Sequence, residues 1–100
     1  MASYMRRAAR VDENQQAIVD ALKRVGVSVE IIGKPVDLLI CCRGVTALME
    51  VKNPGRTSAD PESRMTRDQV EFIARWPGTI HVVRTAEEAV RLVLGPEAIA

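Results

Sequence analysis

The segment from Val36 to Lys52 constrains the fold of this chain more than any other. Val36 to Cys42 is almost entirely apolar, Val45 to Lys52 is a second strand-like run, and Arg43-Gly44 lies between them. Two such runs joined by two residues predict a β-hairpin, although arginine is not an ideal first residue for the turn. The apolar character of the first run predicts a central strand that is covered on both faces.

A helix is expected before this hairpin. From about Val11 to Val25 the apolar residues recur at helical spacing, and Gly26 can end the helix. Asp12 is the expected N-cap, with Gln15 three residues later as its partner in a capping box. The other expected elements are a strand at Val27–Ile32, a helix capped by Thr66 with Gln69 as box partner and ending near Arg75, a strand at Thr79–Arg84, and a helix capped by Thr85 with Glu88 as box partner and ending near Leu94.

The order of these elements is α-β-β-β-α-β-α, which predicts an α/β fold with a mixed sheet flanked by helices. The length of 100 residues suits one domain, residues 1–100, with its core at about 10–94. Hydrophobic residues make up 47% of the chain and charged residues 27%, which excludes a disordered chain. The stretch Asn53–Met65 is dense in Gly, Pro, Ser and Asp, so it is expected to be a long loop.

Cys41 and Cys42 are adjacent, so in a strand they point to opposite faces and should not bridge each other. Zinc binding is not expected, because the two cysteines lack the spacing and the partners of a zinc motif. The segment MASYMRRAAR has no apolar core of the kind a secretory signal needs, and no apolar run approaches the length of a membrane span. We therefore expect a cytoplasmic protein with reduced cysteines.

Asp37, Glu50 and Lys52 form the most informative constellation. Residues equidistant from a symmetric Arg43-Gly44 turn face each other, which pairs Asp37 with Glu50; a loop of odd length would make them diagonal neighbours. Two carboxylates directly opposite on a sheet repel each other, and a divalent cation such as Mg²⁺ between them removes the conflict. Lys52 is two residues after Glu50, so it points to the same face.

A metal site with an ammonium group beside it suits phosphodiester hydrolysis, because the metal polarises the phosphate and activates water while the ammonium stabilises the developing charge. The same residues also fit a structural interpretation. Glu50 and Lys52 are compatible with an ordinary exposed strand pair, and Asp37 with a turn residue at the start of its strand. Likewise His81, which is alone in an apolar strand, is expected to be structural, and Trp76 is expected to anchor the core or an interface.

Three stretches together resemble the PD-(D/E)XK nucleases, and more narrowly the short stand-alone phage and bacterial form of the virus-type replication-repair nuclease (VRR-NUC) domain. They are RVDENQQAIVDAL, VDLLICCRGVTALMEVK and MTRDQVEFIARWPGTIHVVRTAEEAV, which span residues 10 to about 93. The resemblance implies a restriction-endonuclease-like α-β-β-β-α-β core, to which this chain adds a C-terminal helix.

The resemblance also implies roles for the hairpin residues. Asp37 and Glu50 would bind the metal, Mg²⁺ or Mn²⁺, with help from the carbonyl of Val51, and Lys52 would be catalytic. The chain departs from the family's Pro-Asp at one point, because its proline is Pro35, one residue earlier. Proline shapes the entry to the strand and is not a ligand, so the departure concerns the loop and not the chemistry.

Two further positions are implied by the resemblance, and each has a structural alternative. Gln69 matches a glutamine that the family places near its active site, but it also completes the capping box of Thr66. An acidic residue on the first helix completes the site in many relatives. Asp12 is preferred for that role here and Glu13 is the alternative, while Asp12 is also the expected N-cap. Asn14 belongs to the same signature.

Arginine accounts for eleven of the fourteen basic residues, which mildly favours contact with phosphate groups, although a bias in composition would give the same count. The candidates for phosphate contact could equally form a solvated face. They are Arg6, Arg7, Arg10, Lys34, Arg56, Arg64 and Arg67.

The function expected from these observations is a Mg²⁺- or Mn²⁺-dependent DNA endonuclease with no small-molecule substrate. The resemblance implies a homodimer that cuts branched DNA such as Holliday junctions. The first alternative is a non-catalytic DNA-binding module on a nuclease-like fold, and the second is an assembly domain with no role in nucleic-acid binding.

Overall fold

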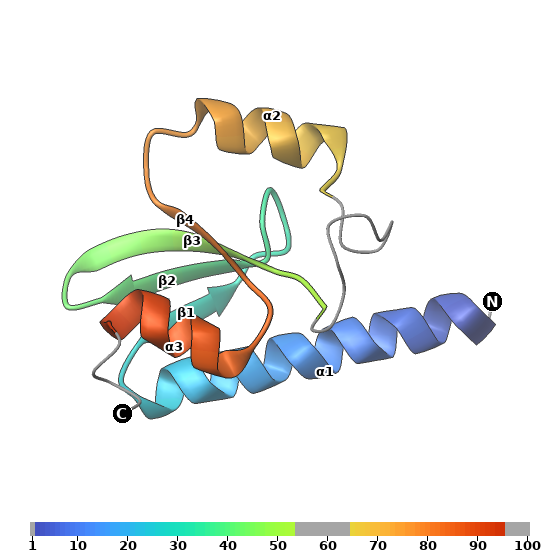
Figure 1. Cartoon of the computed structure of the whole chain (residues 1–100), viewed down its shortest axis with the longest axis horizontal. Helices are drawn as coiled ribbons and strands as arrows, with labels where there is room; N and C mark the ends of the chain where they lie inside the picture. The colour runs from blue at the N-terminus through green and yellow to red at the C-terminus, as the bar shows by residue number, and fades with distance from the viewer. Residues whose placement is uncertain (1, 54–64, 96–100) are drawn as a thin grey trace.

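The computed structural model describes residues 2–53 and 65–95 (Figure 1). The elements occur in the predicted order, and the predicted α/β fold is confirmed. Most of the loop expected at 53–65 lies outside the described residues. The elements are α1 (Ala2–Arg24), β1 (Ser28–Ile31), β2 (Leu38–Cys42), β3 (Val45–Val51), α2 (Arg67–Arg75), β4 (Ile80–Val83) and α3 (Ala86–Leu94).

The four strands form one mixed sheet in the order β1-β2-β3-β4. β2 pairs antiparallel with β1 and with β3, whereas β4 runs parallel to β3. Cys42 faces Val45 across the hairpin turn, so the predicted register is confirmed. Arg43 and Gly44 both have positive φ values, 53° and 81°. This is the combination that a type I′ turn requires, and its twist matches that of the two strands it joins.

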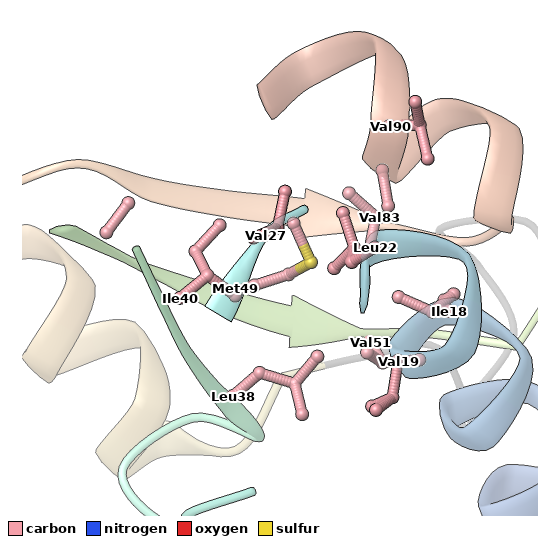
Figure 2. Close-up of a cluster of buried hydrophobic side chains, with 12 residues drawn as sticks. Ile18, Val19, Leu22, Val27, Leu38, Ile40, Met49, Val51, Val83 and Val90 are labelled. Atoms are coloured by element: carbon pink, nitrogen blue, oxygen red, sulfur yellow. The ribbon is translucent and has the colours of Figure 1, made fainter. Parts of the chain in front are cut away.

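The sheet is covered by α1 and α3 on one face and by α2 on the other (Figure 1). The larger core lies beneath α1 and α3 and is drawn in Figure 2. It includes the most deeply buried side chains of α1, of the sheet and of α3. Its buried members are Ile18, Val19, Leu22, Val27, Leu38, Ile40, Ala47, Met49, Val51, Val83, Ala89 and Val90.

A smaller core lies on the face covered by α2, where Val36, Leu48 and Phe72 pack together. Because α2 lies over this part of the sheet, β3 is buried on both faces from Ala47 onward. β2, by contrast, is covered on one face only: Leu38 and Ile40 are buried, but Leu39 between them is exposed. The prediction that the strand at Val36 to Cys42 would be covered on both faces was therefore wrong.

α1 begins at Ala2, well before the predicted start at Val11. Asp12 thus lies inside the helix and is not its N-cap, and Gln15 is not the partner in a capping box. Alanine, methionine and arginine, which are strong helix formers, fill much of the stretch before Val11, so the helix continues through it.

The end of α1 agrees with the sequence. The N–H of Gly26 donates to the carbonyl of Lys23, and the N–H of Val27 donates to that of Leu22. These two bonds define a Schellman motif with Gly26 in its left-handed position, where φ is 90°.

The predicted caps of the two shorter helices are also present. Thr66 and Gln69 form a full capping box at α2. At α3 the hydroxyl of Thr85 accepts a hydrogen bond from the N–H of Glu88, but the Glu88 carboxylate reaches the N–H of Arg84 instead of that of Thr85. Both short helices are therefore fixed at their N-terminal ends by side chains.

Two other expectations concern the cysteines and membranes. Cys41 and Cys42 are free, as predicted. Among the described residues, no helix combines the length and the apolar character that crossing a bilayer requires.

Candidate metal-binding and catalytic site

The site lies where the chain enters β2 and leaves β3. Asp37 comes directly before β2, and its backbone is held by its own carbonyl, which accepts hydrogen bonds from the N–H groups of Ile32 (2.9 Å) and Gly33 (3.2 Å). The Asp37 carboxylate then accepts a bond from the N–H of Val51, at 2.8 Å. In return, the N–H of Asp37 donates to Oε1 of Glu50, at 3.2 Å. The two acidic residues therefore meet across the hairpin, as the register predicts.

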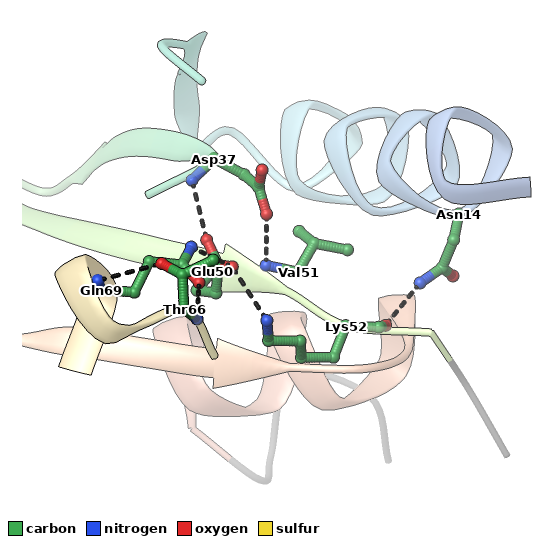
Figure 3. A network of polar contacts seen from close by, with 7 residues as sticks. All are labelled: Asn14, Asp37, Glu50, Val51, Lys52, Thr66 and Gln69. Atoms are coloured by element: carbon green, nitrogen blue, oxygen red, sulfur yellow. Dashed lines mark hydrogen bonds and ion pairs between the residues drawn. The ribbon is translucent and has the colours of Figure 1, made fainter. Parts of the chain in front are cut away.

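Lys52 completes this group from the same side of β3 (Figure 3). Its Nζ lies 3.2 Å from Oε2 of Glu50, and both side chains are buried, with exposed fractions of 9% for Lys52 and 5% for Glu50. The neighbours Met49 and Val51 point into the larger core. Glu50 and Lys52 are thus not an exposed strand pair; they form an ion pair inside the protein.

Gln69 links this ion pair to α2. Its Nε2 donates to Oε2 of Glu50 at 2.7 Å, while its Oε1 accepts from the N–H of Thr66 at 3.1 Å. The predicted capping role of this glutamine is therefore confirmed, and the same amide also binds the buried carboxylate of Glu50. Because Glu50 also receives bonds from Asp37 and Lys52, its two oxygens face three N–H donors.

The electrostatics of Asp37 reflect its crowded position. Burial raises the pKa of its carboxyl from 3.8 to about 6; the hydrogen bond from Val51 opposes this shift, whereas the negative charge of Glu50 adds to it. A carboxyl in this situation holds its proton more tightly than a free one because no positive charge compensates it fully. A cation placed beside Asp37 would favour the ionised form.

The donor set fits a hard divalent cation. Asp37 and Glu50 offer carboxylate oxygens, and the carbonyl of Val51 points to the same side as its N–H, which already meets Asp37. No cluster of three or more His, Cys, Asp or Glu side chains occurs within 2–53 and 65–95. Two carboxylates are nevertheless sufficient for Mg²⁺, which uses one or two of them and keeps several water ligands.

The first helix contributes differently from expectation. The backbone of Asp12 is helical, but its side chain lies outside the described residues, and Glu13 is exposed. Asn14, which the resemblance includes in the signature of the first helix without a stated role, donates hydrogen bonds from its amide to the carbonyls of Lys52 (2.9 Å) and Arg84 (3.1 Å). Its spacing of four and eight residues from the apolar Ile18 and Leu22 is the signal that could have placed it on the sheet-facing side.

The predicted phosphate-binding residues are only partly described. Lys34 is exposed, and Arg67 is exposed and paired with Glu71 at 3.1 Å. The backbone of the predicted N-terminal basic run belongs to α1, but its side chains are not among those described, and neither are the predicted residues of the long loop. The residues concerned are Arg6, Arg7, Arg10, Arg56 and Arg64.

An open hollow of about 580 Å³ lies next to the site. Its walls come from the loop before Asp37 and from the first turn of α2, including the residue that binds Glu50. The lining residues are Gly33, Lys34, Pro35, Thr66, Asp68 and Gln69. Gln69, which binds Glu50, is the residue that connects this hollow to the site.

His81 and Trp76 were expected to have structural roles. His81 is half-buried in β4, and burial lowers the pKa of its imidazole. Trp76 is 42% exposed and stacks on Phe72 with ring centroids 5.1 Å apart. Trp76 therefore covers the edge of the smaller core, and the prediction of a core anchor holds only in part.

Of three comparisons with known proteins, the search of solved structures found a match, and this match agrees with the fold. The sequence matches no family model, and no curated protein matches it either. A solved structure described as "VRR_NUC domain" superimposes with a TM-score of 0.64; the match covers 87% of this chain and 97% of that one, at 20% sequence identity. At this identity the likeness concerns the fold. The chain has the fold of a VRR_NUC domain, a nuclease-like α/β fold, as its sequence resemblance implied.

Proposed function

We propose that this protein is a metal-dependent DNA endonuclease. The observation that carries the proposal is the convergence of two carboxylates and one buried ammonium group at the ends of neighbouring strands, next to an open hollow. A structural ion pair has no need of a third charged group. Asp37 is that group; its burial and the negative charge of Glu50 disfavour its ionised form, which a bound cation would stabilise.

In this proposal Asp37, Glu50 and the carbonyl of Val51 hold Mg²⁺ or Mn²⁺. When bound, the ion supplies Lewis acidity toward the phosphate and lowers the pKa of bound water. Lys52 directs its ammonium group toward the negative charge that develops on the phosphate. Gln69 fixes the orientation of Glu50, so the carboxylate is held in place before a substrate arrives.

The substrate in this proposal is DNA, and branched DNA such as a Holliday junction is the finer expectation. Lys34 and Arg67 lie on the walls of the hollow or beside it, and cationic groups there would contact the phosphates next to the scissile one. A homodimer would bring two such sites to one junction, since a single chain of 100 residues offers little surface to hold four DNA arms.

The test is a cleavage assay on linear, flap and four-way-junction DNA, with Mg²⁺ or with EDTA. Glu50→Gln and Lys52→Met remove one charge each, whereas Glu30→Gln and Lys23→Met remove the same charges from exposed positions. We expect Glu50→Gln and Lys52→Met each to lose activity by roughly 10²–10³-fold, the loss typical of removing one transition-state contact. The control pair should cleave like the wild type.

Equal cleavage by Glu50→Gln and the wild type would show that the proposed site is not the active site. Salt-sensitive binding of DNA by the wild type, without cleavage in any divalent cation, would instead favour the non-catalytic DNA-binding module. Size measurement by light scattering tests the homodimer independently of activity.

A further inference from the structure

Asn14 makes two long-range hydrogen bonds, one of which ends at Lys52 of the candidate site. Its amide donates to the carbonyl of Lys52 at 2.9 Å and to that of Arg84 at 3.1 Å. Figure 3 shows the Asn14 side chain extending from α1 to the carbonyl of Lys52, the residue directly after β3. One side chain thus connects the ends of two parallel neighbouring strands, β3 and β4, to a helix.

The position of Asn14 follows from the pattern of α1. Ile18 and Leu22, four and eight residues later, are fully buried against the sheet, so Asn14 lies on the same face of the helix. β3 and β4 end at Val51 and Val83, and carbonyls just past a strand end lack partners in the sheet. An apolar residue in place of Asn14 would leave these carbonyls without their donor.

As a result, both the N–H and the carbonyl of Lys52 are hydrogen-bonded. Its N–H donates to the carbonyl of Val83 at 2.8 Å, and its own carbonyl receives Asn14. The preceding residue, Val51, is buried in the larger core. The far end of the Lys52 side chain is then held by Glu50. A four-carbon side chain with both ends restrained has little freedom, which is the preorganisation that a catalytic ammonium group needs.

We infer that Asn14 is a positioning residue: its amide holds the end of β3 so that the ammonium group of Lys52 faces the reacting phosphate. This inference rests on the proposed function. Asn14 itself touches neither the phosphate nor the metal ligands in this account. Its removal should therefore slow the chemical step and leave the binding of DNA and of Mg²⁺ unchanged.

The test uses Asn14→Ala, which removes the amide, and Asn14→Asp, which keeps the shape but cannot donate when ionised. Gln16→Ala and Gln16→Glu are matched controls on the same helix, because the amide of Gln16 is exposed and bonds only to Asp20 among the described residues. Four quantities are compared: the single-turnover cleavage rate at saturating Mg²⁺, the Mg²⁺ concentration for half-maximal rate, the dissociation constant for DNA in EDTA, and the melting temperature.

The expected result is a loss of roughly tenfold to hundredfold in the single-turnover rate of both Asn14 variants, the size of effect that a small misplacement of a catalytic group produces. The DNA dissociation constant and the Mg²⁺ requirement should stay within about twofold of the wild type, and the Gln16 controls should not change in any of the four quantities. Rates are measured well below each melting temperature, with sucrose added if needed to favour the folded state.

Three results would overturn the inference. The first is a wild-type rate in the folded Asn14 variants, and the second is a parallel loss of DNA binding, which would indicate a general structural role. The third is a failure of both variants to fold even in sucrose, which would make Asn14 a residue of stability alone. Absence of cleavage by the wild-type protein is a separate outcome, since it would refute the proposed function before Asn14 is considered.

Discussion

The two faces of β3 have opposite chemistry. Met49 and Val51 point into the core beneath α1 and α3, and both are almost completely buried. Glu50 and Lys52, which alternate with them, are just as buried but lie on the side of α2 and hold each other as an ion pair. One strand therefore carries an apolar core on one side and a charged site on the other, with the same degree of burial.

This contrast shows why the position of the site is so strictly determined. In a strand, successive side chains point to opposite faces, so a slip of one residue would exchange the two sets. Glu50 and Lys52 would then enter the apolar core without partners, and Met49 would face Asp37. The core thus enforces the register, and the register places the carboxylates opposite each other. The predictions that follow test whether the two faces can be separated.

The largest effect on stability is expected on the charged face. Glu50→Gln leaves the buried ammonium of Lys52 without its counter-charge, which should lower the free energy of unfolding by about 3–5 kcal/mol. In the double variant Glu50→Gln/Lys52→Met the unpaired charge is gone, so most of the stability should return while cleavage stays lost. Urea denaturation measures the first quantity, and the junction assay measures the second.

The exposed pair Arg67–Glu71 provides the control for this prediction. Both side chains are largely in water, so Glu71→Gln should change stability by less than about 1 kcal/mol. If Glu50→Gln and Glu71→Gln cost the same, the pair on β3 is not isolated from solvent and the contrast between the two faces fails.

The apolar face should respond in stability alone. Met49→Ala creates a cavity in the larger core and should lower the free energy of unfolding by about 2–5 kcal/mol. Thr46→Ala, at an exposed position of the same strand, should change it by less than about 0.5 kcal/mol. Cleavage by Met49→Ala, measured at a temperature where the variant is folded, should be close to that of the wild type. A large loss there would mean that the core and the site are not separable.

Much of this arrangement could be predicted from the sequence because it depends on local signals. The Arg43-Gly44 turn defines the hairpin register, and the register with the two-residue period places Asp37, Glu50 and Lys52 together. The capping box of α2 likewise depends on residues only three apart. In each case the structure follows from residues that are close together in the sequence.

The parts that could not be predicted depend on how distant elements pack. Leu39 is exposed because α2 lies over β3 and β4 and leaves β2 open, which no pattern within β2 reveals. The bonds of Asn14 join it to residues 38 and 70 positions away, so its role appears only when α1 is docked on the sheet. The start of α1 differs from the prediction for another reason: the continuous run of helix-forming residues before Val11 outweighs the capping signal at Asp12.

The protonation state of Asp37 should link the stability of the charged face to metal binding. The pKa of Asp37 is about 6 in the folded protein, against 3.8 for a free aspartate carboxyl in the unfolded chain, so the folded state binds the proton more tightly. In the absence of metal, the stability from this group is fully present below pH 4 and is lost as the pH rises through about 6. Above pH 6 the ionised Asp37 is available to a cation, which should restore the lost stability.

The measurement is the gain in melting temperature on addition of Mg²⁺ at pH 5 and at pH 8. We expect a clear gain at pH 8, equivalent to about 2.7 kcal/mol at a hundredfold excess over the dissociation constant, and a much smaller one at pH 5. In Asp37→Asn the gain at pH 8 should largely disappear. An equal gain at both pH values in the wild type would place the bound ion away from Asp37.

The smallest effect compares two helices with the same N-cap. Thr66 and Thr85 each accept a hydrogen bond from the N–H three residues later, so Thr66→Ala and Thr85→Ala should each lower stability by about 1 kcal/mol. Only α2 carries a glutamine that reaches Glu50 from inside its capping box. Thr66→Ala should therefore also slow cleavage by a few-fold, through the loosened Gln69, whereas Thr85→Ala should leave cleavage unchanged. Equal rates in the two variants at equal stability would show that the helix cap and the candidate site are independent, and that Gln69 holds Glu50 without help from Thr66.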